Sequence, residues 1–96
     1  MQIGNNLEFE FSLKNMVNDT QTVRLEYAVY FLKLNGQLSK KVFKISESQI
    51  RQNDKRQILR KHNFKVITTK RYYRGTHKLS IIINGQELEI YKFELI

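Results

Sequence analysis

The strongest structural signal in the chain is the stretch HKLSIIINGQELEI, residues 77–90. Apolar side chains recur at alternate positions of its first arm, at Leu79, Ile81 and Ile83, which places them on one face of a β-strand. Asn84-Gly85 follows, and both residue types tolerate the positive φ angles that a two-residue hairpin turn requires. The stretch therefore predicts an antiparallel β-hairpin with a half-buried first arm.

The return arm of this hairpin changes its pattern partway along. Leu88 and Ile90 share one parity, whereas Tyr91, Phe93 and Leu95 share the other. A strand whose apolar parity switches either carries an extra residue in its ladder or exposes one of its sides. We therefore expect a β-bulge or a change of facing near Ile90.

Strand patterns also precede the hairpin. Residues 7–13 alternate apolar and polar side chains, and residues 23–32 are rich in the aromatic and β-branched types that sheets favour. Asn35-Gly36 predicts a turn into a third strand at residues 42–45, whose buried face the pattern leaves ambiguous. Two or more further strands are therefore expected before the hairpin.

Residues 46–64 fit two strands around a polar loop at residues 52–55 better than they fit a helix. Ile50 and Ile58 lie eight positions apart with mostly polar residues between them, too thin an apolar stripe for a packed helix. Together these patterns predict five to seven short strands and no amphipathic helix. This predicts an all-β fold, an immunoglobulin-like two-sheet antiparallel sandwich, with a small barrel as the alternative.

The length and composition of the chain exclude several classes of protein. The 96 residues have the size of one domain, so we expect residues 1–96 to form a single one. The chain has no cysteine, which excludes a disulfide framework and a thiolate nucleophile. Its apolar runs are far shorter than the roughly 20 residues that cross a bilayer. The first residues lack the features of a secretory signal, so we expect a cytoplasmic location.

Catalytic chemistry has no clear candidate residues. His62 and His77 are the only histidines, and both share strand parity with apolar residues, so we interpret them as structural rather than metal-binding or proton-transferring. Glu8 and Glu10 fit a solvated strand face, and the four glycines are too scattered to hold a phosphate. The sequence therefore predicts no enzyme activity, no cofactor and no metal.

Positive charge is concentrated in one part of the chain. The net charge is +8, and Arg51 to Lys78 contains ten of the 17 basic residues and one of the nine acidic ones. If these bases gather on one face, they suit a polyanion such as nucleic acid. The alternative is that they are solvated strand faces, with the tyrosines of this window packing over the end of the sandwich.

The predicted DNA-binding residues combine cations that bind phosphate with aromatic rings that can stack on bases. We expect them to contact mainly the phosphate backbone, with little discrimination between sequences. They are Arg60, Lys61, Lys65, Lys70, Arg71, Tyr72, Tyr73 and Arg74.

Several stretches together resemble one known module over nearly the whole chain. They are LEFEF (7–11), YAVYF (27–31), KVFK (41–44), KHNF (61–64) and ITTKRYY (67–73). The sequence is similar to the C-terminal immunoglobulin-like domain of AlkC-type bacterial DNA alkylation repair proteins. In those proteins the module follows a HEAT-like repeat domain that carries base excision, and it helps to enclose the DNA.

The resemblance implies a non-catalytic DNA-binding accessory domain. Its partners would be DNA and the HEAT-like repeat glycosylase domain of a full-length protein. Lys70, Arg71, Tyr72 and Tyr73 carry over as motif positions. Arg74 stands where the family is expected to have proline, and residues 51–54 replace an expected proline-glycine turn, so the shapes of these two loops are not implied.

Two other functions fit the composition. The first is a protein-interaction or scaffolding sandwich that uses exposed apolar residues, with Tyr30, Leu32 and Ile82 as candidates. The second is the sugar-binding or spacer sandwich of secreted glycosidases. The missing signal, the basic charge and the absence of tryptophan count against this second function.

Overall fold

The computed structural model describes Gln2, residues 4–64 and residues 72–96. The strands are β1 (Asn6–Lys14), β2 (Gln21–Leu32), β3 (Leu38–Ile50), β4 (Lys55–Asn63), β5 (Gly75–Ile83) and β6 (Gln86–Leu95). All their pairings are antiparallel, which confirms the predicted all-β class. Within the described ranges, no helix is long and apolar enough to cross a membrane.

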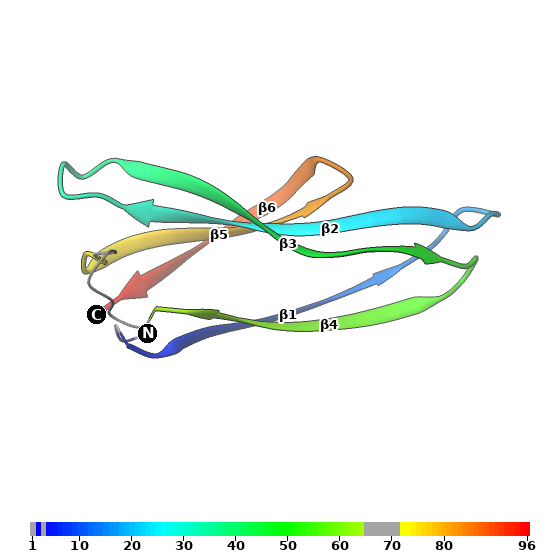
Figure 1. Ribbon diagram of the computed structural model, residues 1–96, viewed down its shortest axis with the longest axis horizontal. Coiled ribbons are helices and arrows are strands. Elements are labelled where there is room, and N and C mark those ends of the chain that lie inside the picture. Colours follow the sequence, from blue (N-terminus) through cyan, green and yellow to red (C-terminus); the bar gives the residue numbers. More distant parts are fainter. Residues whose placement is uncertain (1, 3, 65–71) are drawn as a thin grey trace.

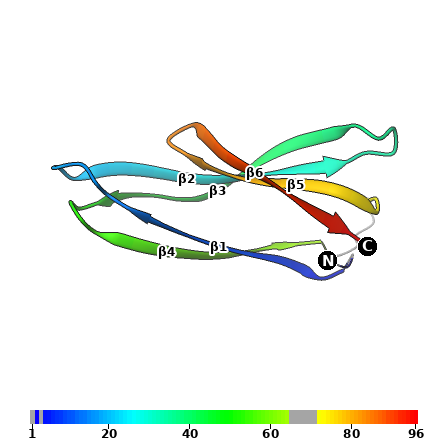
Figure 2. The same cartoon turned by 180° about the vertical axis from the view of Figure 1, so that it is seen from behind.

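The strands form two layers. β1 pairs with β4, and the other four strands form a sheet of order β3-β2-β5-β6. Figures 1 and 2 show the smaller sheet packed against one face of the larger one. The molecule measures 47 × 22 × 21 Å, since the strands of both layers run along its long axis. The two-sheet sandwich is confirmed, and the described strands do not close into a barrel.

The core between the layers is rich in aromatic rings. Tyr27 of β2 meets Phe9 of β1 edge to face at a centroid distance of 5.0 Å and stacks on Phe43 of β3 at 5.1 Å. Its hydroxyl lies 2.9 Å from Nδ1 of His62 on β4. Four strands therefore meet at one tyrosine, and the alternation of residues 7–13 supplies the β1 side of this contact.

Both histidines are structural, as predicted. His62 is buried and bonded to Tyr27. His77 is fully buried: its Nδ1 accepts a hydrogen bond from the backbone N–H of Leu32 at 3.3 Å, and its Nε2 lies 2.8 Å from the carbonyl oxygen of Tyr73. Both contacts are satisfied by the tautomer in which Nε2 donates and Nδ1 accepts.

The hairpin of β5 and β6 forms as predicted. Asn84 and Gly85 have φ angles of 49° and 83°, as the two-residue turn requires. In the ladder, Leu88 and Glu89 of β6 stand opposite the single residue Ile81 of β5. This is the β-bulge expected near Ile90, and it explains the switch of apolar parity along the return arm.

The third strand is longer than its sequence pattern indicated. β3 extends from Leu38 to Ile50 and contains a bulge, with Ile45 as the extra residue opposite the Leu25–Glu26 step of β2. Parity does not hold through a bulge, which is why the buried face of residues 42–45 was ambiguous. A turn at residues 51–54 then leads into β4. Extended structure on both sides of a polar loop is thus confirmed for residues 46–64, but the first of the two predicted strands is the end of β3 rather than a separate strand.

Asn15 joins two turns at the end of the molecule opposite the termini (Figure 1). Its side-chain Nδ2 donates hydrogen bonds to the carbonyl oxygens of Asp19 and Ile50, both at 2.8 Å. Its Oδ1 accepts a bond from the backbone N–H of Val17 at 2.9 Å. The buried amide therefore fastens the β1–β2 connection to the end of β3.

A polar cluster crosses the outer face of the four-stranded sheet. The carboxylate of Glu87 accepts hydrogen bonds from the hydroxyls of Ser80 and Tyr30, and the ammonium group of Lys40 lies 3.3 Å from it. The hydrogen bonds from Ser80 and Tyr30 hold the pKa of Glu87 below its usual value. The four residues come from four different strands, so the cluster links the whole sheet.

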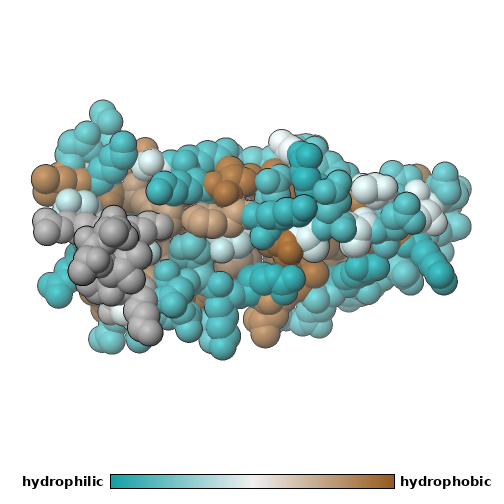
Figure 3. Space-filling model, in the orientation of Figure 1, coloured by the Kyte–Doolittle hydropathy of each residue, from teal (hydrophilic) through white to brown (hydrophobic). Residues whose placement is uncertain are grey.

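The apolar residues expected to be exposed on this outer face are largely covered. Ile82 is only 5% exposed, which corrects the expectation, and Tyr30 and Leu32 are half-buried. Glu26 and Glu87 flank Ile82 across the ladder on both sides. Figure 3 shows a different side of the sandwich, with the two layers seen edge-on as in Figure 1, and hydrophilic side chains cover most of it with scattered hydrophobic patches.

Candidate nucleic-acid interface

Tyr72 and Tyr73 lie where the chain enters β5, and the core holds them in place. The ring of Tyr72 packs on Phe64 at 5.0 Å and on Phe31 at 6.0 Å, and burial raises the pKa of its hydroxyl. The carbonyl oxygen of Tyr73 contacts the buried ring of His77. Both tyrosines are half-buried, so two consecutive residues hold the segment before β5 against the core.

Two lysines from a distant part of the sequence lie beside these tyrosines. A hollow of about 310 Å³ is bounded by Tyr72 and Tyr73 on one side and by residues of the β2–β3 hairpin on the other, including Lys33 and Lys41. Arg74, the next residue along, is exposed. We call the group of Lys33, Lys41, Tyr72, Tyr73 and Arg74 the tyrosine end. It combines cations with aromatic rings, as phosphate and base contacts require.

Sequence reasoning missed Lys33 and Lys41 as site residues. Lys41 entered the sequence analysis only as the first residue of the KVFK stretch of the family resemblance. The pairing of β2 with both β3 and β5 brings the two lysines to Tyr72 and Tyr73, and no local pattern reports that strand order. The position of Lys33 just before the Asn35-Gly36 turn was the one available signal, because it places this lysine at an end of the sandwich.

Arg60 and Lys61 lie near the end of β4 that leads to Phe64. Both are exposed, and as consecutive strand residues they project to opposite faces of their sheet. Nζ of Lys61 lies 3.5 Å from the carboxylate of Glu8, and the guanidinium of Arg60 donates to the carbonyl oxygen of Leu59 at 2.9 Å. An exposed ion pair such as Lys61–Glu8 is weak and leaves the lysine able to exchange partners.

The basic residues of the 51–78 window do not all gather on one face. Arg56 lies at the end of β4 remote from the tyrosine end, where its guanidinium bonds Ser48 and Gln49. Lys61 projects from the smaller sheet and Lys78 from the outer face of the larger one. The expectation of one basic face thus fails for the described bases. The predicted Lys65, Lys70 and Arg71 lie outside the described residues.

The two-layer antiparallel architecture defines the chain as an immunoglobulin-like domain. Residues 1–96 match the family model described as "Uncharacterised protein YhaZ, C-terminal Ig-like domain". The chain belongs to this family.

Two known proteins share the sequence or the fold over almost the whole chain. The uncharacterized protein YhaZ of Bacillus subtilis strain 168 is 43% identical over 93 residues, which cover 97% of this chain and 26% of YhaZ. The structure of Pseudomonas fluorescens alkylpurine DNA glycosylase AlkC, bound to DNA containing an abasic site analog, matches with a TM-score of 0.93 and 26% identity. That match covers 99% of this chain and 27% of AlkC. The resemblance to AlkC-type proteins is therefore confirmed, and the chain spans about a quarter of each relative.

A third match concerns the fold alone. A mutant β-glucosidase from Listeria innocua in complex with laminaribiose has a TM-score of 0.82 and 10% identity, over all of this chain and 14% of the enzyme. At that identity the match adds nothing to the sugar-binding alternative. The likeness to AlkC, by contrast, associates this domain with DNA repair.

Proposed function

We propose that residues 1–96 form a single non-catalytic accessory domain of a DNA alkylation repair protein, and that the domain binds the phosphate backbone of duplex DNA. The observation that carries the proposal is the likeness to part of AlkC, a glycosylase whose structure contains DNA. Base excision would belong to another part of a longer protein, with the HEAT-like repeat glycosylase domain as the partner. The net charge of +8 supports attraction to a polyanion.

The tyrosine end supports the proposal because its cations have no acidic partner among the described residues. Lys33, Lys41 and Arg74 are exposed, and among the described residues none of the three forms an ion pair. Lys65, Lys70 and Arg71 add three charges in the sequence just before Tyr72. Each phosphate that these residues neutralise would contribute about −0.9 to the slope of log affinity against log salt concentration.

The test is a salt titration of binding to a fluorescent DNA duplex. The test variant replaces Lys70, Arg71 and Arg74 with alanine. The control variant replaces Lys14, Arg51 and Lys55, which removes the same charge from the end of the 47 Å molecule that is remote from Tyr72, Tyr73 and Arg74. We expect the test variant to bind more weakly and its salt slope to flatten by about 0.9 for each phosphate that is no longer neutralised, while the control keeps the slope of the unmodified chain.

Equal losses of affinity in the two variants would mean that net charge alone attracts the DNA, and would contradict a localised surface. Unchanged affinity in the test variant would exclude the proposed residues. A duplex of unrelated sequence completes the design, because phosphate contacts predict similar affinities for both sequences.

A further inference from the structure

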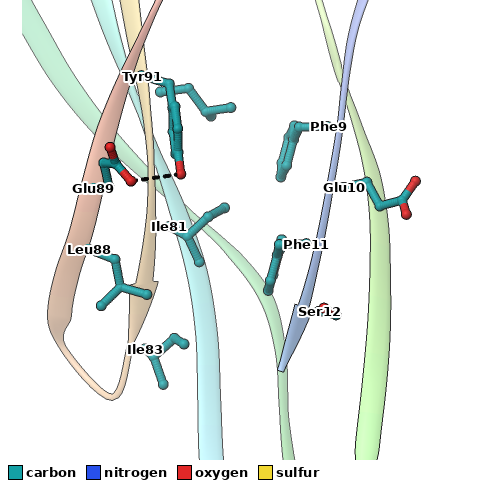
Figure 4. A pocket seen from close by; sticks show the side chains of 10 residues that line it. Phe9, Glu10, Phe11, Ser12, Ile81, Ile83, Leu88, Glu89 and Tyr91 are labelled. Carbon is teal, nitrogen blue, oxygen red and sulfur yellow. Dashed lines mark hydrogen bonds between the residues drawn. The ribbon is translucent and has the colours of Figure 1, made fainter. Parts of the chain in front are cut away.

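An apolar groove runs along the side of the sandwich that the smaller sheet leaves uncovered. In the described ranges the smaller sheet has two strands and the larger one has four, so no described strand covers part of the inner face of β5 and β6. The groove has a volume of about 440 Å³. Figure 4 shows Phe9 and Phe11 of β1 on one side of it, facing Ile81, Ile83, Leu88 and Tyr91 on the other.

The backbone edge of β1 borders this groove. Four consecutive residues, Phe9 to Ser12, line it, although alternate side chains of a strand point to opposite faces. The lining therefore includes the edge of the strand itself. Among the described residues β1 pairs with β4 alone, so its second edge carries no ladder. An edge of this kind is a template for another strand.

The far wall of the groove exposes large apolar side chains. Leu88 is 46% exposed and Tyr91 is 55% exposed. The bulge in β6 turns both Leu88 and Glu89 to this side, since both line the groove. A strand laid against β1 would cover these side chains with every second residue of its own.

The acidic residues of the groove indicate the charge of its occupant. Glu10 and Glu89 line it, and neither is ion-paired within the described part of the chain. Glu10 accepts a hydrogen bond from Gln57, and Glu89 accepts one from the hydroxyl of Tyr91 at 3.1 Å. Figure 4 shows the Glu10 side chain pointing away from the pocket, and Glu8, two residues earlier on the same face of β1, lies 3.5 Å from Lys61. Positive side chains on the outward face of an added strand would lie beside Glu8 and Glu10.

We propose that the groove binds an extended segment of a partner protein, in which apolar residues alternate with lysine or arginine, by adding it as a strand to the free edge of β1. Its apolar residues fill the space between Phe11 and Leu88, and its basic residues face the glutamates of β1. This interaction is separate from DNA binding, because it uses neither the tyrosine end nor any basic residue of the chain.

Antiparallel pairing of two copies through β1 is sterically unfavourable. Figure 4 shows β5 and β6 across the pocket from β1, and in the described residues both belong to the four-stranded sheet whereas β1 has β4 as its one partner. If two copies paired through β1 as antiparallel strands, about a two-fold axis perpendicular to the sheet, their larger sheets would lie on the same side of the joined small sheets and would overlap. A single extended segment meets no such obstacle.

The test measures binding of a labelled peptide, RVKIRVK, to the 96-residue chain by fluorescence anisotropy. Peptide RRKKVVI has the same composition without alternation, and peptide EVEIEVE has alternation with the opposite charge. We expect RVKIRVK to bind more tightly than either control. Hydrogen exchange with the peptide bound should slow at the amides of residues 7–13.

Two lysine substitutions on one strand separate the groove from the rest of the surface. Leu88 and Ile90 are 46% and 45% exposed, but Leu88 lines the groove while Ile90 pairs with Ser80 on the outer face. We expect Leu88→Lys to weaken binding of RVKIRVK by about tenfold or more, the loss of affinity expected when one apolar side chain no longer packs against the peptide. Ile90→Lys should leave binding unchanged.

Four outcomes would overturn the proposal: equal effects of the two lysine substitutions, equal binding of the three peptides, protection confined to amides outside β1, or a dimer in sedimentation that Leu88→Lys dissociates. Failure of the DNA titration would leave this proposal intact, because the peptide assay contains no DNA.

Discussion

Single side chains hold the ends of this sandwich together, and Asn15 is the clearest case. Replacing Asn15 with alanine removes three hydrogen bonds and leaves the buried carbonyl of Ile50 without its side-chain donor. We expect the free energy of unfolding to fall by about 2 to 3 kcal/mol, measured by urea denaturation. Asn18→Ala is the matched control: Asn18 is exposed in the same connection, and its replacement should cost at most about 0.5 kcal/mol.

Glu87 should make stability depend on pH. Its folded pKa is lowered by the bonds from Ser80 and Tyr30, so the ionised carboxylate stabilises the folded state above the unfolded pKa, about 4.3. This stabilisation is lost as pH falls below that value through the folded pKa. We expect Glu87→Gln to melt at a lower temperature than the unmodified chain at pH 7, and the difference to shrink by pH 3. A difference in melting temperature that is constant with pH would contradict this assignment.

For single residues, the sequence predicted the structural roles of side chains better than it predicted their exposure to solvent. The structural interpretation of His62 and His77 followed from strand parity and proved correct. The exposure expected for Ile82 was wrong, because an outer-face residue is covered when its cross-strand neighbours have long side chains. Parity reports which face a residue occupies, but not how far its neighbours shield it.

The entry to β5 depends on one glycine. Gly75 has a φ of 137°, and a β-carbon there would lie 2.7 Å from Cδ2 of Leu32. We expect Gly75→Ala to lower the free energy of unfolding by about 2 kcal/mol or more, and to weaken DNA binding because Tyr72 and Tyr73 are displaced. Gly36→Ala is the control, since Gly36 also has a positive φ but meets nothing within 4 Å. A larger decrease in the Gly36 variant would refute this account.

Whole strands could be predicted where a turn or a regular alternation of apolar and polar residues defined them. The Asn84-Gly85 turn specified the β5–β6 hairpin, and the alternation of residues 7–13 specified β1. β3 was predicted too short, because its bulge at Ile45 moves the apolar residues from one parity to the other. A bulge depends on the partner strand, which a single segment does not reveal.

For the whole molecule, the two-layer class was predictable but the order of strands was not. The candidate site depended on that order. The adjacency of β3, β2 and β5 brings Lys33 and Lys41 to Tyr72 and Tyr73, whereas the remote position of Arg56 could not be inferred from its place in the basic window. Charge counted along the chain therefore overstated how compactly the described bases are arranged.

The two sheets should differ in how easily they open. Within the described part of the chain β1 pairs with β4 alone. Its ladder pairs Phe9 with Arg60, which are far apart in the sequence, so forming it closes a long loop. We expect native-state hydrogen exchange to show β1 and β4 amides opening at lower free energy than those of β2 and β5. Equal protection in all four strands would contradict this expectation.

Such subglobal unfolding would uncover Phe9, Phe43 and Tyr27 while the larger sheet stays intact. A partly open population of this kind is where proteolytic nicking and amyloid-like association would begin, well below the melting temperature of the domain. The ease with which the two-stranded sheet unfolds would therefore limit the kinetic lifetime of the native state.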